Sequence, residues 1–580
     1  MRQWMVAAKK ADFYAIAEKF HVDPVVARII RNREVIGEKN IRIYLGGNLS
    51  DLSDPHQMKD MDRLVEILAQ KIRKQVHIRI IGDYDVDGVT SSHLFLTALR
   101  RVGAKVDVVI PHRIQDGYGL SLHLLQQAKE DGVDTILTCD NGIAAIDEIA
   151  WAKAQKMTVL VTDHHAVPFE EHEGRRTEKK SLADAVVNPH QQDCRYPYKE
   201  LCGAGVAWNV IRVLYENYDM DKREAEDLLD FVAMATVCDV MSLTGENRIL
   251  VKEGLKRIRH TKNIGLQALM QACNVQPENI SAYHFGYVLG PCVNATGRLD
   301  TARHALRLFE TGQETEAEEI ARDLVDLNQE RKELTLQGVE MAKKLCEEGG
   351  YENDPILVLF LPDVHESIAG LIAGRIREMY NRPVFVLTRG EEGVKGSGRS
   401  TENYSMYENM CGCAELFTKF GGHPMAAGLS LPEENVEKFR RKINENCPLT
   451  VEEVCPDIHI DMAMPVGYAS TELVHQFALL EPFGKDNPSP LFADRNLSIS
   501  RMWLIGKNRN VLRMSVLSEY GQPVPVIFFG DVETLFAYFT EKFGQEEVEN
   551  ALHGRKNRIL FSMVYTAKTV SYTHLTLPTI

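Results

Sequence analysis

Short apolar runs, each too short for a helix, recur through the first half of the chain. They are rich in Ile and Val and occupy residues 77–81, 106–110, 135–139, 158–162 and 184–187. Segments with apolar residues at helical spacing lie between them, as at residues 120–131 and 144–155. Buried strands that alternate with helices are typical of a parallel sheet covered on both faces. The pattern therefore predicts an α/β domain.

The segments around this domain have other patterns. Residues up to about 75 indicate helices and loops, with a turn at 51–55 and a helix at 61–72. Helices at 221–241 and 251–259 are expected to close the domain. The strongly charged stretch 170–180 predicts a solvated loop.

A long helix is predicted between residues 316 and 348. Its apolar residues follow near-heptad spacing: Ile320, Leu324, Leu327, Leu334, Met341 and Leu345. At 1.5 Å per residue such a helix would reach roughly 50 Å. Most of its surface is polar, which favours a bridge between two domains over a core helix. Two helices broken near Gly338 are the alternative.

Beyond this helix the pattern changes twice. Strands at 356–360 and 383–387 predict a second, smaller α/β domain. After residue 448 the chain becomes a series of short β segments, at 458–461, 497–500, 511–516 and 524–529. Turn-separated strands of this kind favour a small β-barrel like the oligonucleotide-binding (OB) fold.

The predicted organisation is therefore a multidomain one, as 580 residues require. It comprises an N-terminal helical segment (1–75), a parallel-sheet domain (76–310), a connecting helix (311–349), a smaller α/β domain (350–450), an OB-like barrel (451–569) and a tail (570–580). Residues 571–578 look like translated read-through, so the tail is interpreted as non-native and excluded from fold reasoning.

Composition narrows the class of protein but not its partner. The apolar fraction of 44% and charged fraction of 26% are those of an ordinary soluble protein. No apolar run is long enough to span a bilayer and the N-terminus lacks a signal peptide, so we expect a cytoplasmic protein without membrane contact. The 11 cysteines follow no metal-ligand spacing, and those such as Cys139 and Cys238 are expected to be buried thiols.

Net charge of −15 argues against a protein that coats nucleic acid non-specifically. It does not exclude a nucleic-acid enzyme, because a metal centre requires many acids and a cleft can be basic in an acidic chain.

Acidic residues follow the first predicted strand. Asp83, Asp85 and Asp87 alternate, so an extended backbone would point all three carboxylates one way. They repel one another unless a cation neutralises them, and Gly82 and Gly88 permit a tight turn around that cation. An exposed Asp-rich turn or a calcium loop is the alternative, but no Glu occupies the EF-hand position.

Further acids and histidines follow later apolar runs. Asp140 ends the strand 135–139, Asp163-His164-His165 follows 158–162, and Asp239 follows the apolar run 231–237. Asp140 alone could be a helix cap. Ligand sites of open α/β sheets lie at the carboxyl ends of strands, and carboxylates with imidazoles there suit two divalent metals and phosphoryl chemistry.

These motifs resemble those of the DHH phosphoesterase superfamily. Residues 111–120, 294–298 and 481–484 resemble segments of the bacterial exonucleases of that superfamily that are specific for single strands. Residues 395–400 and 421–428 resemble the signatures of the associated DHHA1 domain. The resemblance implies a DHH domain and a DHHA1 domain in the two predicted α/β units, with the OB-like barrel after them.

The resemblance also implies a metal centre. One ion would be held by Asp85 and Asp140, with Asp83 nearby, and a second by Asp87, Asp140, His164 and Asp239. His165 would face the scissile phosphate, so that His165, Asp140 and Asp83 form the implied catalytic group. The implied cofactors are two ions of Mn²⁺ or Mg²⁺, and the implied reaction is stepwise 5′-to-3′ hydrolysis of single-stranded DNA to 5′-mononucleotides in repair and recombination.

Several residues are predicted to bind the substrate. Guanidinium groups match phosphate geometry, and glycine-rich backbone suits a compact anion site. The predicted contacts are Arg113, Tyr118, Arg298, Ser397, Arg399 and His423, with Ser397 and Arg399 capturing the 5′ phosphate. A plain glycine turn with a surface arginine, and a sharp turn before a buried strand, are the alternatives at Arg399 and His423.

On the barrel, a basic and aromatic group is predicted to hold the downstream strand: Trp503, Lys507, Arg509 and Arg513. The same spacing also occurs on ordinary barrel exteriors.

The sequence departs from the family pattern at three places. Ile81 stands where some members have a histidine, 363–367 differs from the usual run at the start of the DHHA1 domain, and 294–296 is poorer in alanine than usual. Two other functions remain open: a DHH–DHHA1 phosphodiesterase for small oligonucleotides or cyclic dinucleotides, and a catalytically inactive single-strand-binding scaffold. Implied partners are single-stranded DNA, a RecQ-type helicase and a single-strand-binding protein, and we expect a monomer.

Overall fold

The computed structural model describes residues 4–113, 116, 119–172, 175–351, 353–390, 393–454, 457–506, 510–568 and 574–577. These residues form two compact units. The first unit consists mainly of Leu52–Met241 and Ile249–Pro456, and the second of Gln3–Asp51, Ser242–Arg248 and Asp457–Ile580. Within the described ranges, no helix is both long and apolar enough to cross a membrane.

The first unit contains the predicted parallel sheet. Its five strands, in spatial order, are β3 (Val106–Val109), β2 (Ile78–Ile81), β4 (Thr135–Cys139), β5 (Thr158–Thr162) and β8 (Ala185–Val187), and all neighbours are parallel. Helices α4 (Met61–Arg73), α5 (Val86–Arg101) and α8 (Gly203–Asn217) cover one face. Helices α6 (Leu122–Glu130) and α7 (Ile146–Ala154) cover the other. The predicted α/β domain is confirmed.

The strand order places a break in direction between β2 and β4. From β2 the chain crosses to β3 on one side, and it then returns past β2 to β4 and continues outward to β5 and β8. The chains that leave β2 and β4 therefore diverge at their carboxyl ends, which opens a crevice at that edge of the sheet.

Helices complete this part of the unit. They are α9 (Lys222–Glu226), α10 (Leu229–Cys238), α11 (Gly245–Ile258), α12 (Ile264–Ala272), α13 (Ala282–His284), the π-helical turn η4 (Phe285–Leu289), α14 (Gly290–Leu299) and α15 (Ala302–Glu310). The stretch 221–241, predicted to be helical, forms two helices: α9 ends before Asp227, and α10 begins at Leu229.

The charged stretch predicted as a loop is also different. β6 (Phe169–His172) and β7 (Arg175–Glu178) pair as an antiparallel hairpin, and Lys179 Nζ lies 3.2 Å from Glu170 Oε1. Backbone pairing in a two-stranded ribbon does not require an apolar face, so charge alone did not exclude strands here.

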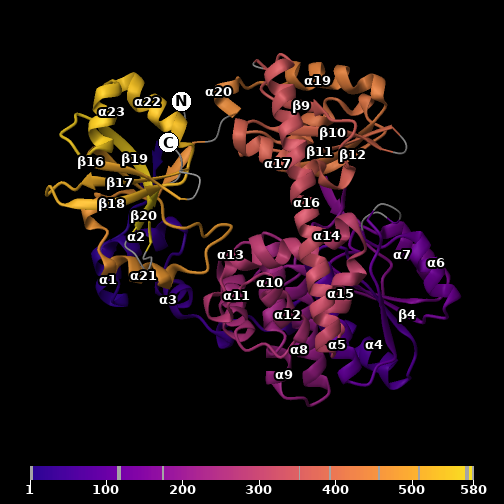
Figure 1. Cartoon of the computed structure of the whole chain (residues 1–580). Helices are drawn as coiled ribbons and strands as arrows, with labels where there is room; N and C mark the ends of the chain where they lie inside the picture. The colour runs from indigo at the N-terminus through magenta and orange to yellow at the C-terminus, as the bar shows by residue number, and fades with distance from the viewer. Residues whose placement is uncertain are drawn as a thin grey trace. The chain divides into compact units, whose positions relative to one another are not determined.

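The long helix is unbroken. α16 runs from Glu314 to Glu348, and in Figure 1 it extends from α12, α14 and α15 to the second sheet of the unit. Gly338 does not break it. A Cβ atom at Gly338 would lie 2.3 Å from Cδ1 of Ile372, so the glycine instead permits close packing against α17 (Ala369–Tyr380).

The second sheet is the predicted smaller α/β domain. Its order is β12 (Lys419–His423), β13 (Ala426–Leu431), β11 (Gly393–Arg399), β10 (Val384–Gly390) and β9 (Leu357–Phe360). Only β9 and β10 are parallel neighbours among these described strands. α17 and the end of α16 pack on one face, and α18 (Met406–Cys411) with α19 (Val436–Glu445) pack on the other.

The second unit contains the predicted barrel. Its six-stranded sheet has the order β15 (Met462–Ala463), β16 (Phe492–Ile505), β17 (Val511–Leu517), β18 (Pro523–Phe528), β20 (His574–Leu577) and β19 (Leu560–Lys568). The sheet curls so that β16 pairs with both β17 and β19. Four described residues of the segment interpreted as a non-native tail, 574–577, form β20 between β18 and β19.

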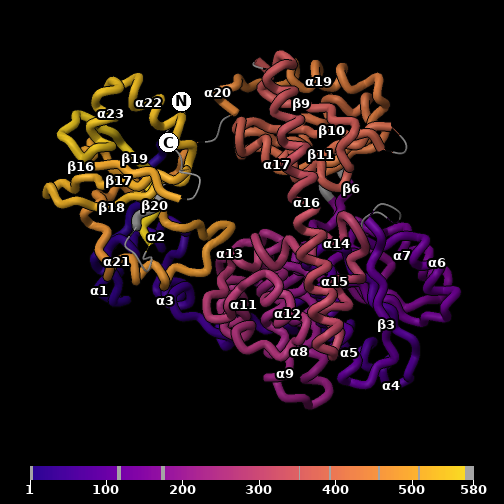
Figure 2. Tube along the Cα trace, viewed as in Figure 1, coloured from indigo at the N-terminus to yellow at the C-terminus, as the bar shows by residue number. Residues whose placement is uncertain are grey.

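The first residues of the chain share the core of this barrel unit. Helices α1 (Phe13–Phe20), α2 (Pro24–Asn32) and α3 (Glu38–Gly46) contribute Val26, Ile30 and Tyr44 to one apolar cluster with barrel residues. Figure 2 shows these indigo helices beside the yellow barrel strands. β1 (Trp4–Val6) also pairs with β14 (Ile458–Ile460), and Arg33 forms a buried ion pair with Asp461 at 2.6 Å.

Candidate metal centre

The predicted acids and histidines converge at the carboxyl edge of the parallel sheet. Asp83 and Asp85 follow β2, Asp140 follows β4, and His164 follows β5. Asp239 reaches the same place from the C-terminal end of α10. The position lies beside the crevice between β2 and β4, where open α/β sheets bind ligands.

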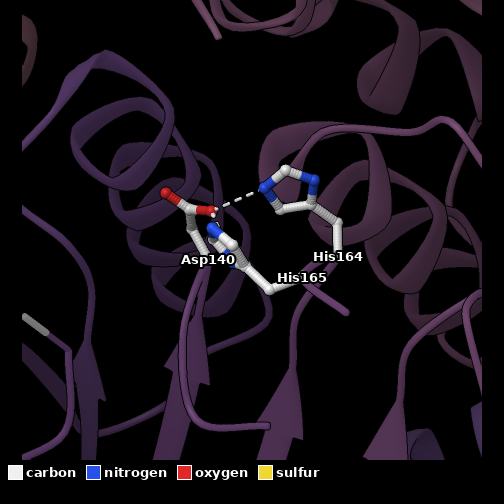
Figure 3. Close-up of side chains that lie close together, drawn as sticks. All are labelled: Asp140, His164 and His165. Carbon is white, nitrogen blue, oxygen red and sulfur yellow. Dashed lines mark ion pairs between the residues drawn. The ribbon is translucent and has the colours of Figure 1, made fainter. Parts of the chain in front are cut away.

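Close contacts define the centre. His164 Nε2 lies 3.1 Å from Asp140 Oδ1, 3.6 Å from Asp239 Oδ2 and 3.7 Å from Asp87 Oδ2. His165 Nδ1 lies 3.9 Å from Asp140 Oδ1, and Figure 3 shows both imidazoles on one carboxylate.

Ligand atoms within 4.8 Å of one another form three groups in the described chain. They are Asp83 with Asp85 and Asp140, Asp87 with His164 and Asp239, and Asp140 with His164 and His165. Asp140 therefore lies between two groups of possible ligands.

Glycines let the first loop fold tightly. A Cβ atom at Gly88 would lie 2.4 Å from the carbonyl oxygen of Asp83, and one at Gly82 would lie 2.0 Å from Ser92 Oγ. Asp85 caps α5 by accepting a hydrogen bond from the backbone N–H of Gly88 at 3.0 Å. The loop thus presents Asp83, Asp85 and Asp87 around the start of α5.

The N-terminus of α8 positions Asp87. The backbone N–H groups of Gly203 and Ala204 donate to its two carboxylate oxygens at 2.6 and 2.8 Å. A Cβ atom at Gly203 would lie 2.6 Å from Cβ of Asp140, so only glycine permits this approach. Our sequence analysis missed both donors; the run of small residues at 203–205 was the available signal.

Asn141 and the backbone conformation of Asp140 determine the position of the chain at the carboxyl end of β4. Asp140 has φ +62°, a left-handed conformation that aspartate tolerates. The Asn141 side chain donates to the carbonyl oxygens of Ile81 and Cys139 at 3.0 and 2.9 Å, which ties β2 to β4. Asn294 of α14 similarly accepts from the backbone N–H of Val86 at 3.1 Å.

Asp163 orients the histidines and does not join the ligand groups. It accepts from the backbone N–H groups of Ile143 and His164 at 2.9 and 2.7 Å, and lies 2.8 Å from His165 Nδ1. Burial opposes the charged form of His165, but the Asp163 hydrogen bond and nearby carboxylates raise its pKa to about 9.

The electrostatics of the centre fit a divalent cation. Burial and the neighbouring carboxylates raise the pKa of Asp83, Asp85 and Asp140, well above the ordinary value for Asp83 and Asp140. Burial lowers the pKa of His164 and keeps its imidazole neutral, as a metal ligand must be. Within the described chain, the buried Oδ1 of Asp83 makes no hydrogen bond. Crowded carboxylates with an unsatisfied oxygen need a cation.

Ile81 takes no part in this centre. Its side chain is fully buried and packs in the apolar cluster beneath α6 and α7. The carboxylates of Asp83 and Asp140 supply oxygens nearby.

A groove of about 410 Å³ lies beside Tyr84 of the first loop. Its cationic lining residues are Arg113, Lys395 and Lys419, and Ser397 lies among small residues of β11, β12 and β13. A Cβ atom at Gly421 would meet nothing within 4 Å. The glycines therefore leave room for a ligand that reaches the backbone.

Three predicted arginines lie close to this groove and to one another. Burial, and then the charges of Arg113, Arg331 and Arg399, lower the pKa of Arg298 to about 10. Burial and Arg113 also lower the pKa of Arg399. Arg298 donates to the carbonyl oxygen of Ser367 at 2.7 Å, and Arg113 lies over the Tyr84 ring at 4.9 Å. Clustered guanidinium groups of this kind suit phosphate.

The remaining predicted residues are placed differently. His423 is exposed at the end of β12 and does not line the groove. On the barrel, Arg513 and Arg501 lie 5.8 and 4.9 Å from the Trp503 ring. The predicted contacts Tyr118, Lys507 and Arg509 lie outside the described residues.

Comparison with known proteins identifies three domains. Residues 77–236 match the DHH family N-terminal domain, residues 353–447 the DHHA1 domain, and residues 460–572 the RecJ OB domain.

Curated relatives cover most of the chain. The single-stranded-DNA-specific exonuclease RecJ of Haemophilus influenzae is 34% identical over 518 residues, which cover 86% of this chain and 88% of that protein. The Escherichia coli protein of that name is 33% identical, with the same coverage. The Bacillus subtilis protein is 33% identical over 512 residues, and the match spans 88% of this chain but only 63% of that relative.

Solved structures share the fold. The crystal structure of RecJ in complex with Mn²⁺ from Thermus thermophilus matches with a TM-score of 0.79 and 24% identity, covering 99% of this chain and 78% of that one. A crystal structure of exonuclease RecJ bound to manganese matches with a TM-score of 0.57 and 32% identity, covering 67% of this chain and 94% of that one. The three domains, the metal-binding geometry and the identity to full-length relatives together place this chain in the RecJ family of DHH phosphoesterases.

Proposed function

We propose that this chain is a metal-dependent exonuclease that degrades single-stranded DNA from its 5′ end and releases 5′-mononucleotides. One observation carries the proposal: a buried cluster of carboxylates and one neutral imidazole lies beside a groove whose lining includes Arg113, Lys395 and Lys419, with Glu366 paired to Lys395. Hydrolysis of a phosphodiester needs both features, since the phosphate carries negative charge and charge builds on its oxygens during reaction.

We assign two cation sites to the centre. Asp83, Asp85 and Asp140 would hold one cation, and Asp87, His164, Asp239 and the shared Asp140 the other. Divalent cations such as Mn²⁺ or Mg²⁺ held there would lower the pKa of a coordinated water and stabilise charge on phosphoryl oxygens.

His165 is assigned to the substrate. Asp163 fixes its Nδ1 side by the 2.8 Å contact, so the opposite side of the ring is the one that would face a ligand. With its pKa raised to about 9, the imidazole carries a proton near neutral pH. It would donate a hydrogen bond to a phosphoryl oxygen of the scissile group.

The arginine cluster is assigned to the 5′ phosphate. Ser397 and Arg113 line the groove, and burial together with the charge of Arg113 lowers the pKa of both Arg298 and Arg399. A terminal phosphate has more negative charge than an internal one, so this site would favour the chain end and set the polarity. Tyr118 and His423 are further proposed contacts.

The barrel is assigned to the downstream strand. Its family match is to an OB domain, a fold that binds single strands by stacking and backbone charge. Trp503 with Arg513, and Lys507 with Arg509, are the proposed contacts. We further propose a cytoplasmic monomer that acts in DNA repair and recombination with a RecQ-type helicase and a single-strand-binding protein.

The decisive test uses a thirty-nucleotide single strand labelled at either end, with or without a 5′ phosphate, in Mn²⁺. We expect labelled mononucleotide at once from the 5′-labelled strand, but only late from the 3′-labelled strand. Asp140→Asn should abolish release, and duplex DNA should resist.

The same assay separates the rival functions. Faster hydrolysis of a dinucleotide than of the thirty-nucleotide strand would favour a small-oligonucleotide phosphodiesterase and refute the proposal. Binding of the strand without any metal-dependent hydrolysis would indicate an inactive scaffold.

A further inference from the structure

Two cysteines lie close together outside the metal centre. Cys273 follows α12 and Cys292 lies in α14, and their Sγ atoms are 3.8 Å apart. Both are free thiols. A disulfide needs an Sγ separation of about 2.0 Å, so the sulfurs would approach each other by roughly 1.8 Å, a shift within the range of side-chain rotation.

The two thiols differ in access. Cys273 is partly exposed, whereas Cys292 is 2% exposed. The Cys292 thiol donates to the carbonyl oxygen of Val288 at 3.2 Å and accepts from the side-chain amide of Asn328 at 3.4 Å. Cys273 is therefore the more accessible of the two residues, and the Cys292 thiol is buried and hydrogen-bonded.

The surroundings are positively charged. Arg331 of α16 donates to the Asn328 side chain at 2.9 and 3.1 Å, and Lys332 lies close enough to act on both sulfurs. The contact with the Cys292 sulfur, and then the charge of Lys332, lower the pKa of Cys273 although its partial burial opposes them. Reactive cysteines are found in such electropositive, partly exposed places.

We propose that Cys273 and Cys292 form an oxidisable dithiol that a peroxide converts to an intrachain disulfide. The Cys273 thiolate attacks one oxygen of the peroxide, the O–O bond breaks, and sulfenic acid and hydroxide form. Hydroxide takes the Cys292 proton and becomes water. The Cys292 thiolate then attacks the Cys273 sulfur, the S–S bond forms, and the S–O bond breaks. The leaving hydroxide takes up the proton first lost by Cys273, so two thiols and hydrogen peroxide yield one disulfide and two waters.

The dithiol is coupled to the metal loop through α14. Two residues after Cys292, the side chain of Asn294 holds the backbone N–H of Val86 at 3.1 Å. Further along the same helix, a Cβ atom at Gly297 would lie 2.4 Å from the carbonyl oxygen of Tyr84. A link from α14 to the end of α12 would shift these contacts. The second part of the inference, which rests on the proposed function, is that the disulfide lowers hydrolytic activity.

The test treats the full chain with hydrogen peroxide, blocks remaining thiols with iodoacetamide and maps peptides by mass without reduction. We expect one cross-linked peptide pair containing Cys273 and Cys292, 2 Da lighter than the sum of the free peptides because two hydrogens are lost, and its disappearance after dithiothreitol. Cys273→Ser and Cys292→Ser should each lack it. Cys411→Ser, which removes an exposed thiol, should retain it.

Activity is measured on the same samples. We expect a several-fold loss on oxidation that dithiothreitol restores, and no such reversible loss in Cys273→Ser. If both thiols remain alkylated after peroxide, the dithiol is refuted whatever the activity. A disulfide without any change in rate refutes the coupling. If the untreated chain shows no hydrolysis, the proposed function fails while the peptide map still decides the dithiol.

Discussion

Removing the charge of Asp140 should stabilise the fold in the absence of metal and should weaken the stabilisation that a bound metal gives. Asp140→Asn keeps the size of the side chain, and asparagine tolerates the left-handed backbone at φ +62°. The substitution therefore tests charge and ligation rather than conformation. Without metal, we expect the variant to be more stable than the natural chain, because it relieves repulsion among buried carboxylates.

The magnitude follows from the distances. Carboxylate oxygens of Asp83, Asp85 and Asp140 lie within 4.8 Å of one another. Two unit charges at that distance repel by about 3 kcal/mol at an effective dielectric constant of 20. Burial and repulsion raise the pKa of Asp83 and Asp140, so their charged forms are costly in the fold, and the expected gain is about 1–3 kcal/mol. Mn²⁺ at a hundred times its Kd should stabilise the natural chain by about 2.7 kcal/mol and the variant by much less.

The measurement is urea unfolding in EDTA and in Mn²⁺, with hydrogen exchange of peptides from residues 78–162 as the readout. These peptides contain β2, β4 and β5 and report on the sheet that bears the centre. Asp147→Asn is the control, since it removes an exposed charge in the first turn of α7. Equal stabilisation of Asp140→Asn and the natural chain by Mn²⁺, or a less stable variant in EDTA, would refute the reasoning.

Three further predictions concern stability. Burial raises the pKa of Asp230 to about 6 from an ordinary 3.8, so ionisation costs the folded state up to about 3 kcal/mol above pH 6. In urea unfolding at pH 7.5, Asp230→Asn should therefore be more stable than the natural chain. This difference in stability should disappear as the pH falls from 6 to 4. Gly297→Ala should lose about 1–3 kcal/mol by the same measurement despite better helix propensity, because its Cβ would lie 2.4 Å from the Tyr84 carbonyl oxygen. Arg33→Met should destabilise the barrel unit by about 3–5 kcal/mol, because it leaves Asp461 buried without its cation. The double variant Arg33→Met with Asp461→Asn should recover part of this loss. Hydrogen exchange of barrel peptides measures both effects.

Each of these has a contradicting result. A pH-independent effect of Asp230→Asn would mean that burial does not shift its ionisation. Gly374→Ala is the control for Gly297→Ala because its Cβ meets nothing within 4 Å, and equal effects at both sites would contradict the packing argument. A double variant at Arg33 and Asp461 no more stable than Arg33→Met would show that the unpaired carboxylate is not the cause.

The sheet and its acidic edge could be predicted because both depend on short-range patterns. Parallel strands are continuous apolar runs, and their carboxyl ends meet at one edge, so Asp83, Asp140 and His164 could be brought together without knowing the order of strands. The donors to Asp87 were missed because Gly203 is 116 residues away, and the small residues at 203–205 have no side chain that would link them to that carboxylate.

The sequence also did not reveal which elements the amphipathic helices pack against. The apolar face of α2, with Val26 and Ile30, predicts burial but not against what, and its partner is the barrel more than 400 residues later. The break between α9 and α10 was missed since Asp227 and Leu228 contain neither glycine nor proline.

The shared core of α2 and the barrel has a consequence during synthesis. Asp23 at the start of α2 is hydrogen-bonded to Gln476, 453 residues later in the chain. At a translation rate of roughly 5–20 residues per second, the early helix waits about 20–90 s for its partner. Through that interval its apolar face remains uncovered on the ribosome-bound chain. We therefore expect the first helices of a newly made copy to be prone to aggregation until Gln476 and the barrel strands have been made.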